Sequence, residues 1–93
     1  MDRDIFNLKI YTPSGLELEA EVKSVNLTTS VGEIGILPMH TRYVGVLGEG
    51  RLQYTESKSG ETKNLIVSGG FCNFINENLL VLADRNDVNG LRN

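Results

Sequence analysis

The chain has 93 residues, of which 40% are hydrophobic and 23% are charged, and its formal net charge at pH 7 is -3. This size and composition describe one soluble globular domain with a modest core rather than a disordered chain. Its lysines and arginines are scattered along an acidic chain, which argues against the basic stripe of a nucleic-acid-binding protein. No apolar run reaches the roughly 20 residues that span a bilayer, so we expect no membrane insertion.

The first half of the chain is predicted to form strands separated by turns. An apolar segment, residues 5–11, ends at Thr12-Pro13-Ser14-Gly15, where proline fixes φ and glycine tolerates positive φ. A strict alternation follows, and its period of two predicts a strand with one buried and one wet face. The phase slips before Val25, which predicts a bulge near Lys23-Ser24. The alternating apolar residues are Leu16, Leu18, Ala20 and Val22, and the polar ones are Glu17, Glu19, Glu21 and Lys23.

The second half repeats this pattern. Apolar or alternating segments cover residues 43–47, 51–55, 62–67 and 71–76, with turns between them. The run from Leu79 to Ala83 is apolar throughout, consistent with a strand covered on both faces, whereas residues after Asp84 are polar like a terminus. No segment shows an apolar stripe at helical spacing. The pattern predicts an all-β sandwich or flattened barrel in one domain, residues 1–93, with an ordered core over about residues 5–85.

The single histidine, His40, suggests a general base or a metal ligand because imidazole titrates near neutral pH. Its closest acid is Glu33, and no second histidine or cysteine pair lies nearby to complete a zinc site. Ser68-Gly69-Gly70 lacks the nucleophile-elbow pattern, so its glycines indicate a close backbone approach or a bulge. The lone cysteine, Cys72, is interpreted as a small core residue of a protein from a reducing compartment. We predict no catalytic residue.

Two groups of acidic residues suggest a binding role. Asp84, Asn86, Asp87 and Asn89 supply oxygens of the kind that bind calcium, but Val88 at the fifth position from Asp84 and the lack of a closing glutamate break the calcium-loop pattern. A polar turn or a helix N-cap is the better interpretation. The three glutamates in residues 17–21 are most simply the solvated face of a strand, and a basic partner is the alternative. We predict neither a metal nor a cofactor.

The segment Gly32-Glu33-Ile34-Gly35-Ile36-Leu37-Pro38-Met39-His40 resembles a loop of the epsilon subunit of F-type ATP synthases, called delta in mitochondria. The family pattern is Gly-Glu, an apolar residue, Gly-Ile, a variable residue, Pro, often Gly, then His. Val67-Ser68-Gly69-Gly70-Phe71 resembles the Ser-Gly-Gly strand start of that family, and Leu79 to Asp84 resembles its Val-Leu-Ala-Asp ending. After His40, Thr41-Arg42 stands where the family usually has Ala-Pro.

The resemblance implies a β-sandwich of about ten short, mostly antiparallel strands. It also implies a non-catalytic rotor subunit that couples the gamma subunit to the c-ring of an ATP synthase, at the cytoplasmic face of a bacterial membrane. Similar subunits continue into a C-terminal helical hairpin that restrains rotation and in some members binds ATP. This chain ends at Asn93, so those activities are not expected. By motif position, Gly32, Glu33 and Ile34 would contact the c-ring, and His40, Thr41, Arg42 and Tyr43 would contact gamma.

Two other classes of protein stay open on the residues themselves. One is a free-standing β-sandwich adaptor that binds a peptide by strand addition or through the Phe71–Phe74 region. The other is a small enzyme that uses His40 and Glu33.

Overall fold

The computed structural model describes residues 4–39 and 42–87, with side chains placed as far as Asp84. Nine strands and no helix lie in this part of the chain, so the predicted all-β fold is confirmed. The strands are β1 (Phe6–Thr12), β2 (Gly15–Thr29), β3 (Gly32–Ile36), β4 (Tyr43–Val46), β5 (Gly50–Glu56), β6 (Thr62–Ser68), β7 (Phe71–Ile75), β8 (Asn78–Leu82) and β9 (Arg85–Asp87).

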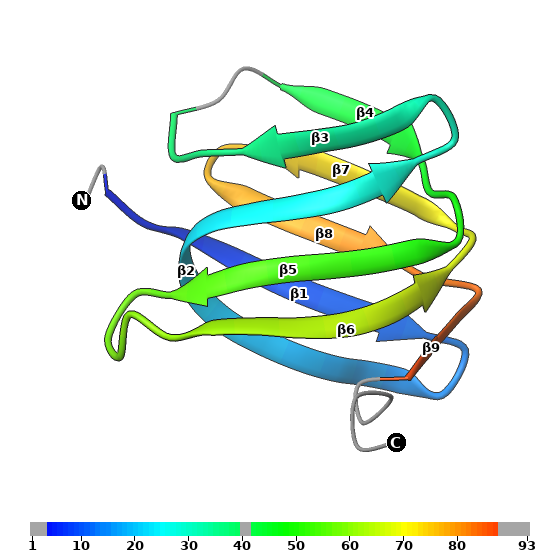
Figure 1. Cartoon of the computed structure of the whole chain (residues 1–93), viewed down its shortest axis with the longest axis horizontal. Coiled ribbons are helices and arrows are strands. Elements are labelled where there is room, and N and C mark those ends of the chain that lie inside the picture. Colours follow the sequence, from blue (N-terminus) through cyan, green and yellow to red (C-terminus); the bar gives the residue numbers. More distant parts are fainter. Residues whose placement is uncertain (1–3, 40–41, 88–93) are drawn as a thin grey trace.

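The strands form one sheet that curls into two facing layers (Figure 1). Their order is β4-β7-β8-β1-β2-β5-β6-β9, and β3 pairs with β2 beside this path. The first half of β2 pairs with β1, and its second half pairs with β3 and β5. We call β4, β7, β8, β1 and the first half of β2 the rear layer, and the remaining strands the front layer. Among the described strands only β1 and β8 pair in parallel, which confirms a mostly antiparallel sandwich.

A bulge in β2 allows this strand to serve both layers. Its register with β5 shifts between Val22 and Ser24, so Lys23 is the extra residue, as the phase slip predicted. Val22 and Val25, on the two sides of the shift, are both 0% exposed. Without the extra residue, the second half of the strand would turn its apolar side chains toward solvent.

A second bulge, which the alternation did not predict, lies near the start of β2. Its register with β1 shifts so that Tyr11 faces Leu16 while Ile10 faces Leu18. Because of this shift Leu16 lies on the outer face of the rear layer and is 49% exposed. The prediction that Leu16 shares a buried face with Val22 is therefore wrong.

The core lies between the layers and is built from alternate residues of nearly every strand. The rings of Phe6 and Phe74 meet edge to face, with centroids 5.2 Å apart and an interplanar angle of 81°. Cys72 is 1% exposed, and burial raises the pKa of its thiol, which confirms it as a core residue. Gly70 has a φ of 103°, and a Cβ there would collide with the Leu82 carbonyl oxygen, which confirms the predicted close approach.

Two predictions for the C-terminal third are wrong. β8 is covered on one face only, since Leu79 is 1% exposed whereas Leu82 is 45% exposed. Arg85–Asp87, within the segment predicted to be a polar turn or a helix cap, form β9, which pairs with residues 66–68 of β6. The end of that segment, Val88 to Gly90, lies outside the described residues. Backbone pairing at a sheet edge needs no apolar side chains, so a polar sequence gives little sign of such a strand.

Candidate docking surfaces

The segment predicted to carry the function, Gly32–His40, begins as a strand. β3 covers its first five residues and is paired, among the described strands, only with β2. The interpretation of the whole segment as a loop is therefore wrong. Glu33 is exposed and lies opposite Thr28, whereas Ile34 is partly buried against the core. His40 lies outside the described residues, as does Thr41.

Thr29 organises the turn that leads into Glu33. Its buried hydroxyl donates to the carbonyl oxygen of Gly32 at 2.6 Å and lies 3.2 Å from the amide nitrogen of Val31, which donates to it. Two backbone hydrogen bonds also fasten this turn to neighbouring strands and loops. Val31 itself is 89% exposed. A firmly held turn thus presents an apolar side chain and a carboxylate to solvent, and the sequence analysis did not single out Val31.

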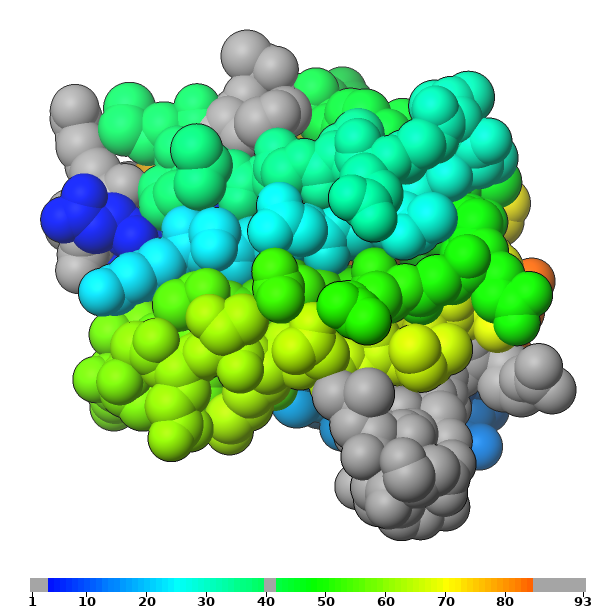
Figure 2. Space-filling view, viewed as in Figure 1, coloured from blue at the N-terminus to red at the C-terminus, as the bar shows by residue number. Residues whose placement is uncertain are grey.

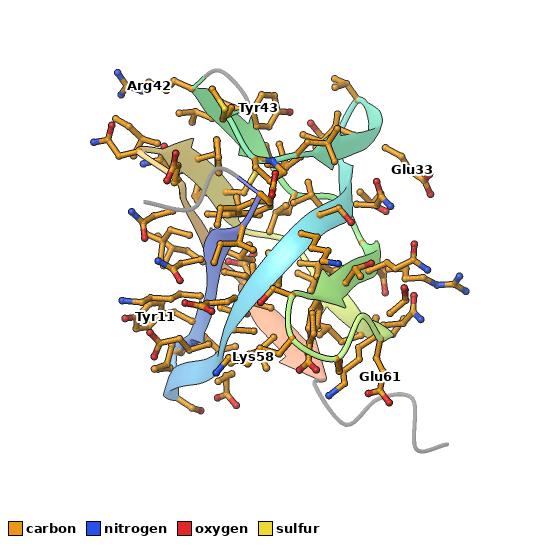
Figure 3. The ribbon with its side chains drawn as sticks, turned by 90° about the vertical axis from the view of Figure 1, so that its left-hand side faces the viewer. Tyr11, Glu33, Arg42, Tyr43, Lys58 and Glu61 are labelled. Atoms are coloured by element: carbon orange, nitrogen blue, oxygen red, sulfur yellow. The ribbon has the colours of Figure 1, made fainter. Side chains whose placement is uncertain are left out.

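Arg42 and Tyr43 lie at the start of β4 and differ in their surroundings. Arg42 is exposed, whereas Tyr43 is partly buried and packs against the core. The Tyr43 ring also lies over Gly45, where a Cβ would come within 2.7 Å of it. Figure 3 shows Arg42 and Tyr11 pointing to one side of the sandwich and Glu33 pointing to the other. Glu33 and Arg42, one residue from each predicted contact set, thus point to different sides of the molecule.

The outer face of the rear layer carries a row of apolar side chains that crosses five adjacent strands. The strand registers pair Val46 with Phe71, Phe71 with Leu82, Leu82 with Tyr11, and Tyr11 with Leu16. Four of these side chains are 45–58% exposed, and Tyr11 is partly buried. We call these five residues the apolar band. Single exposed apolar residues are ordinary, but a continuous row is typical of a binding surface.

The next row along the strands is mixed. It begins with Val44, which is 62% exposed, and the registers continue it through Asn73 and Leu80 to Lys9 and Glu19. The Lys9 ammonium and the Glu19 carboxylate are 3.8 Å apart, with both side chains about half exposed. A hollow of about 270 Å³ opens beside this row, and Tyr11, Asn73 and Leu80 are among its lining residues. This second row is therefore apolar at β4 and charged at β2.

The outer face of the front layer is mostly polar, and Figure 2 views this side. Thr28 is partly buried, and its hydroxyl donates to the Arg51 carbonyl oxygen at 3.4 Å. The Asn26 amide donates to Gln53 at 3.4 Å. A hollow of about 160 Å³ lies over these strands and is lined partly by Glu33 and Arg51. Ile66, at 37%, is an exposed apolar residue on this face.

The described residues also bear on metal binding and membrane insertion. They contain no group of three or more histidine, cysteine, aspartate or glutamate side chains placed to hold a metal ion. No helix long and apolar enough to cross a membrane is found among them.

Sequence reasoning missed the apolar band, although the sequence carried a sign of it. Leu79–Ala83 is apolar on both faces of a strand in a chain too small to cover both. In β7 the exposed Phe71 and Ile75 alternate with the buried Cys72 and Phe74. In the Phe71–Phe74 region named as a possible peptide site, the Phe71 ring is 58% exposed whereas the Phe74 ring is buried.

Known proteins were compared with both the sequence and the fold. The chain is 34% identical over 79 residues to the ATP synthase epsilon chain of Desulfitobacterium hafniense, and this match covers 85% of the chain and 58% of that protein. The chain therefore spans a little over half the length of such curated relatives.

Two solved structures share its fold. A chain in the mitochondrial ATP synthase of Euglena gracilis superposes with a TM-score of 0.82 at 22% identity, over 94% of this chain and 54% of that one. A chain in the central stalk and c-ring of the Tetrahymena thermophila enzyme gives 0.68 at 15% identity, over 87% and 64%. Residues 5–86 match the family described as ATP synthase, delta/epsilon chain, beta-sandwich domain, so the chain belongs to this family.

Proposed function

We propose that this chain serves as a non-catalytic subunit in the central stalk of a rotary F-type ATP synthase, where it couples the gamma subunit to the c-ring. Family membership supports this, as does the name of its bacterial relative, the ATP synthase epsilon chain. The two structural neighbours come from assemblies that contain a c-ring. The bacterial relatives favour the cytoplasmic face of a cell membrane.

The apolar band is the observation that carries this proposal. Its side chains expose a large apolar surface to water, although burying one such side chain contributes about 1.5–3 kcal/mol of stabilising free energy. No element among the described residues packs on that face of the curled sheet. A permanent partner would cover it, and we assign this partner as gamma. Arg42, exposed at the β4 end of the same face, would lie at the rim of the contact.

The remaining gamma-contacting residues are assigned by motif position. His40 and Thr41 precede Arg42 in the chain and are proposed as further gamma contacts. Tyr43 packs against the core, so its proposed part is to hold the start of β4 in place beneath that contact.

The turn around Glu33 is proposed to meet the c-ring. Gly32 and Glu33 are exposed, and Val31 projects beside them. The Thr29 hydrogen bonds hold this turn in one conformation, so little conformational entropy is lost on docking. An exposed carboxylate suits the amide groups or basic side chains of a polar loop. Ile34 packs inward and would support the turn rather than contact the ring.

The experiment that tests the apolar band uses Phe71→Asp with Ile66→Asp as the matched control. Both change an exposed apolar strand residue to aspartate, but Ile66 lies on the front layer. We expect Phe71→Asp to lose co-purification with gamma while Ile66→Asp retains it and both remain folded by circular dichroism. Equal gamma binding by both variants would contradict the proposed surface.

A further inference from the structure

We infer that the element covering the apolar band is an amphipathic helix of gamma, lying across the strands with basic side chains at its β2 end. This inference rests on the proposed function and adds the shape and charge of the partner. It follows from the direction of the band, the polarity of the neighbouring rows, and the distribution of carboxylates around its ends.

The direction of the band favours a helix. Its residues come one from each of five neighbouring strands, from Val46 on β4 to Leu16 on β2. At about 4.8 Å per strand the band is about 19 Å long, which is the length of about 13 residues of helix. A sheet in aligned packing would run within about 30° of the strands rather than along the band, and a sheet in orthogonal packing would cover several rows rather than this one. A single apolar stripe of a helix covers a row of this width and leaves the mixed row beside it uncovered.

The charges are divided between the two ends of this face. Glu19 and Glu21 lie on the outer face of β2, because the registers place them beside Lys9 and Asn7. Lys9 forms an exposed ion pair with Glu19, so one carboxylate remains in excess there. Arg42 is exposed at the opposite end, where β4 begins.

Two further acidic residues lie near the β2 end. Glu17 accepts a hydrogen bond from Thr12 at 2.9 Å, and Glu77 lines a hollow together with Glu21. Lys58 faces the same part of β2 from the β5–β6 turn, whereas Glu56 at the end of β5 is already paired with Lys63. Glu17, Glu19, Glu21 and Glu77 still outnumber Lys9 and Lys58. The acidic excess persists, so the end of the helix over β2 should be basic.

The hollow beside the band offers a place for one long side chain from the flank of the helix. Its lining combines the apolar Tyr11 and Leu80 with the amides of Asn73 and Asn78, and it also includes Lys9, whose ammonium is paired with Glu19. The Asn73 Oδ1 atom is buried and has no hydrogen-bond partner. A lysine or arginine suits such a site, because its stem packs on apolar atoms while its charged head donates hydrogen bonds.

The first test maps the two ends of the band by cross-linking. Single cysteines replace Val46 and Leu16 in complexes with gamma, and Cys72 stays in place because it is buried. Both positions should cross-link to one gamma helix, at sites about 13 residues apart. Cross-links to two different elements, or to strands, would overturn the inference of a helix.

The second test measures the charge at the β2 end. Glu19→Lys plus Glu21→Lys is compared with Glu49→Lys plus Glu61→Lys, which makes the same charge change at exposed sites outside this face. We expect the first variant to weaken gamma binding at least about tenfold and to reduce its salt dependence, while the control changes it less than about threefold. Glu19→Gln plus Glu21→Gln should show an intermediate loss. Equal binding by both lysine variants would overturn the basic end of the helix.

Phe71→Asp separates failure of this inference from failure of the proposed function. If Phe71→Asp abolishes gamma binding while the charge variants bind normally, the apolar surface stands and the inference of a basic helix falls. If Phe71→Asp also binds normally, the proposed function has lost its supporting surface.

Discussion

At the scale of single residues, backbone constraints account for the positions that shape the ends of the sandwich. Gly70 is confined by the backbone of Leu82 and Ala83, and its positive φ favours glycine. In the β2–β3 turn the Thr29 hydroxyl supplies a hydrogen-bond partner to two backbone groups, the Gly32 carbonyl and the Val31 amide. Neither residue belongs to an outer face, yet each determines where a docking residue is presented.

Gly70→Ala should destabilise the domain by about 3 kcal/mol, because it adds a clash to a strained backbone. Gly60→Ala is the matched control: its φ is also positive, at 74°, but no atom lies within 4 Å of the added Cβ. The control should cost about 1–2 kcal/mol. Urea unfolding of both variants measures the difference, and equal free energies of unfolding would contradict the close approach.

Glu56 should make stability depend on pH. Hydrogen bonds from Ser59 and then Lys63 hold the pKa of the Glu56 carboxyl below its ordinary value. A lowered pKa stabilises the fold above the unfolded-state pKa, and this contribution is lost as pH falls through the folded-state pKa. Glu56→Gln should therefore flatten the acid limb of a plot of unfolding free energy against pH. Glu49→Gln is the control, and an unchanged limb in Glu56→Gln would contradict this role.

At the scale of elements, β8 shows how one strand serves the core and the surface together. Leu79 and Val81 point into the core, and Leu82 points outward into the apolar band. β3 is divided in the same way, with Glu33 outside and Ile36 buried. The inner face of each strand therefore stabilises the core, and its outer face is available for binding.

Leu79→Ala should destabilise the isolated domain by about 2–5 kcal/mol, because it leaves a cavity in the core. Leu82→Ser should change the free energy of unfolding by less than about 0.5 kcal/mol, since its side chain is already wet. Leu82→Ser should instead weaken gamma binding. Thermal unfolding and co-purification distinguish the two effects, and a large loss of stability in Leu82→Ser would show that β8 is covered on both faces.

At the scale of the whole molecule, the curled sheet holds two candidate docking surfaces on different sides of one core. The Glu33 turn belongs to the front layer, and the apolar band belongs to the rear layer (Figures 1 and 3). β2 contributes to both layers through an unbroken run of 15 residues. A single strand shared by both layers suits the proposed rotor subunit, because a rotation of one docking surface also rotates the other.

Glu33→Ala plus Arg42→Ala should weaken assembly of the chain with gamma and the c-ring without unfolding the domain, because both side chains are exposed. Glu61→Ala plus Lys63→Ala is the control, because it removes one exposed acid and one exposed base from the β5–β6 hairpin, outside both proposed surfaces. Co-purification measures assembly, and circular dichroism confirms folding. Normal assembly by the Glu33 and Arg42 variant would remove both residues from the proposed contacts.

The sequence alone determined the fold class, the Lys23 bulge, the burial of Cys72 and the close approach at Gly70. Each of these follows from local rules: strand periodicity, a slip in its phase, and the conformational freedom of glycine. The tertiary structure decided which apolar residues face water. Leu16 and Leu82 lie in patterns typical of core residues, but a second bulge turns Leu16 outward and no described element covers Leu82. Periodicity specifies the two faces of a strand, whereas only the packing of the whole sheet determines which of them is covered.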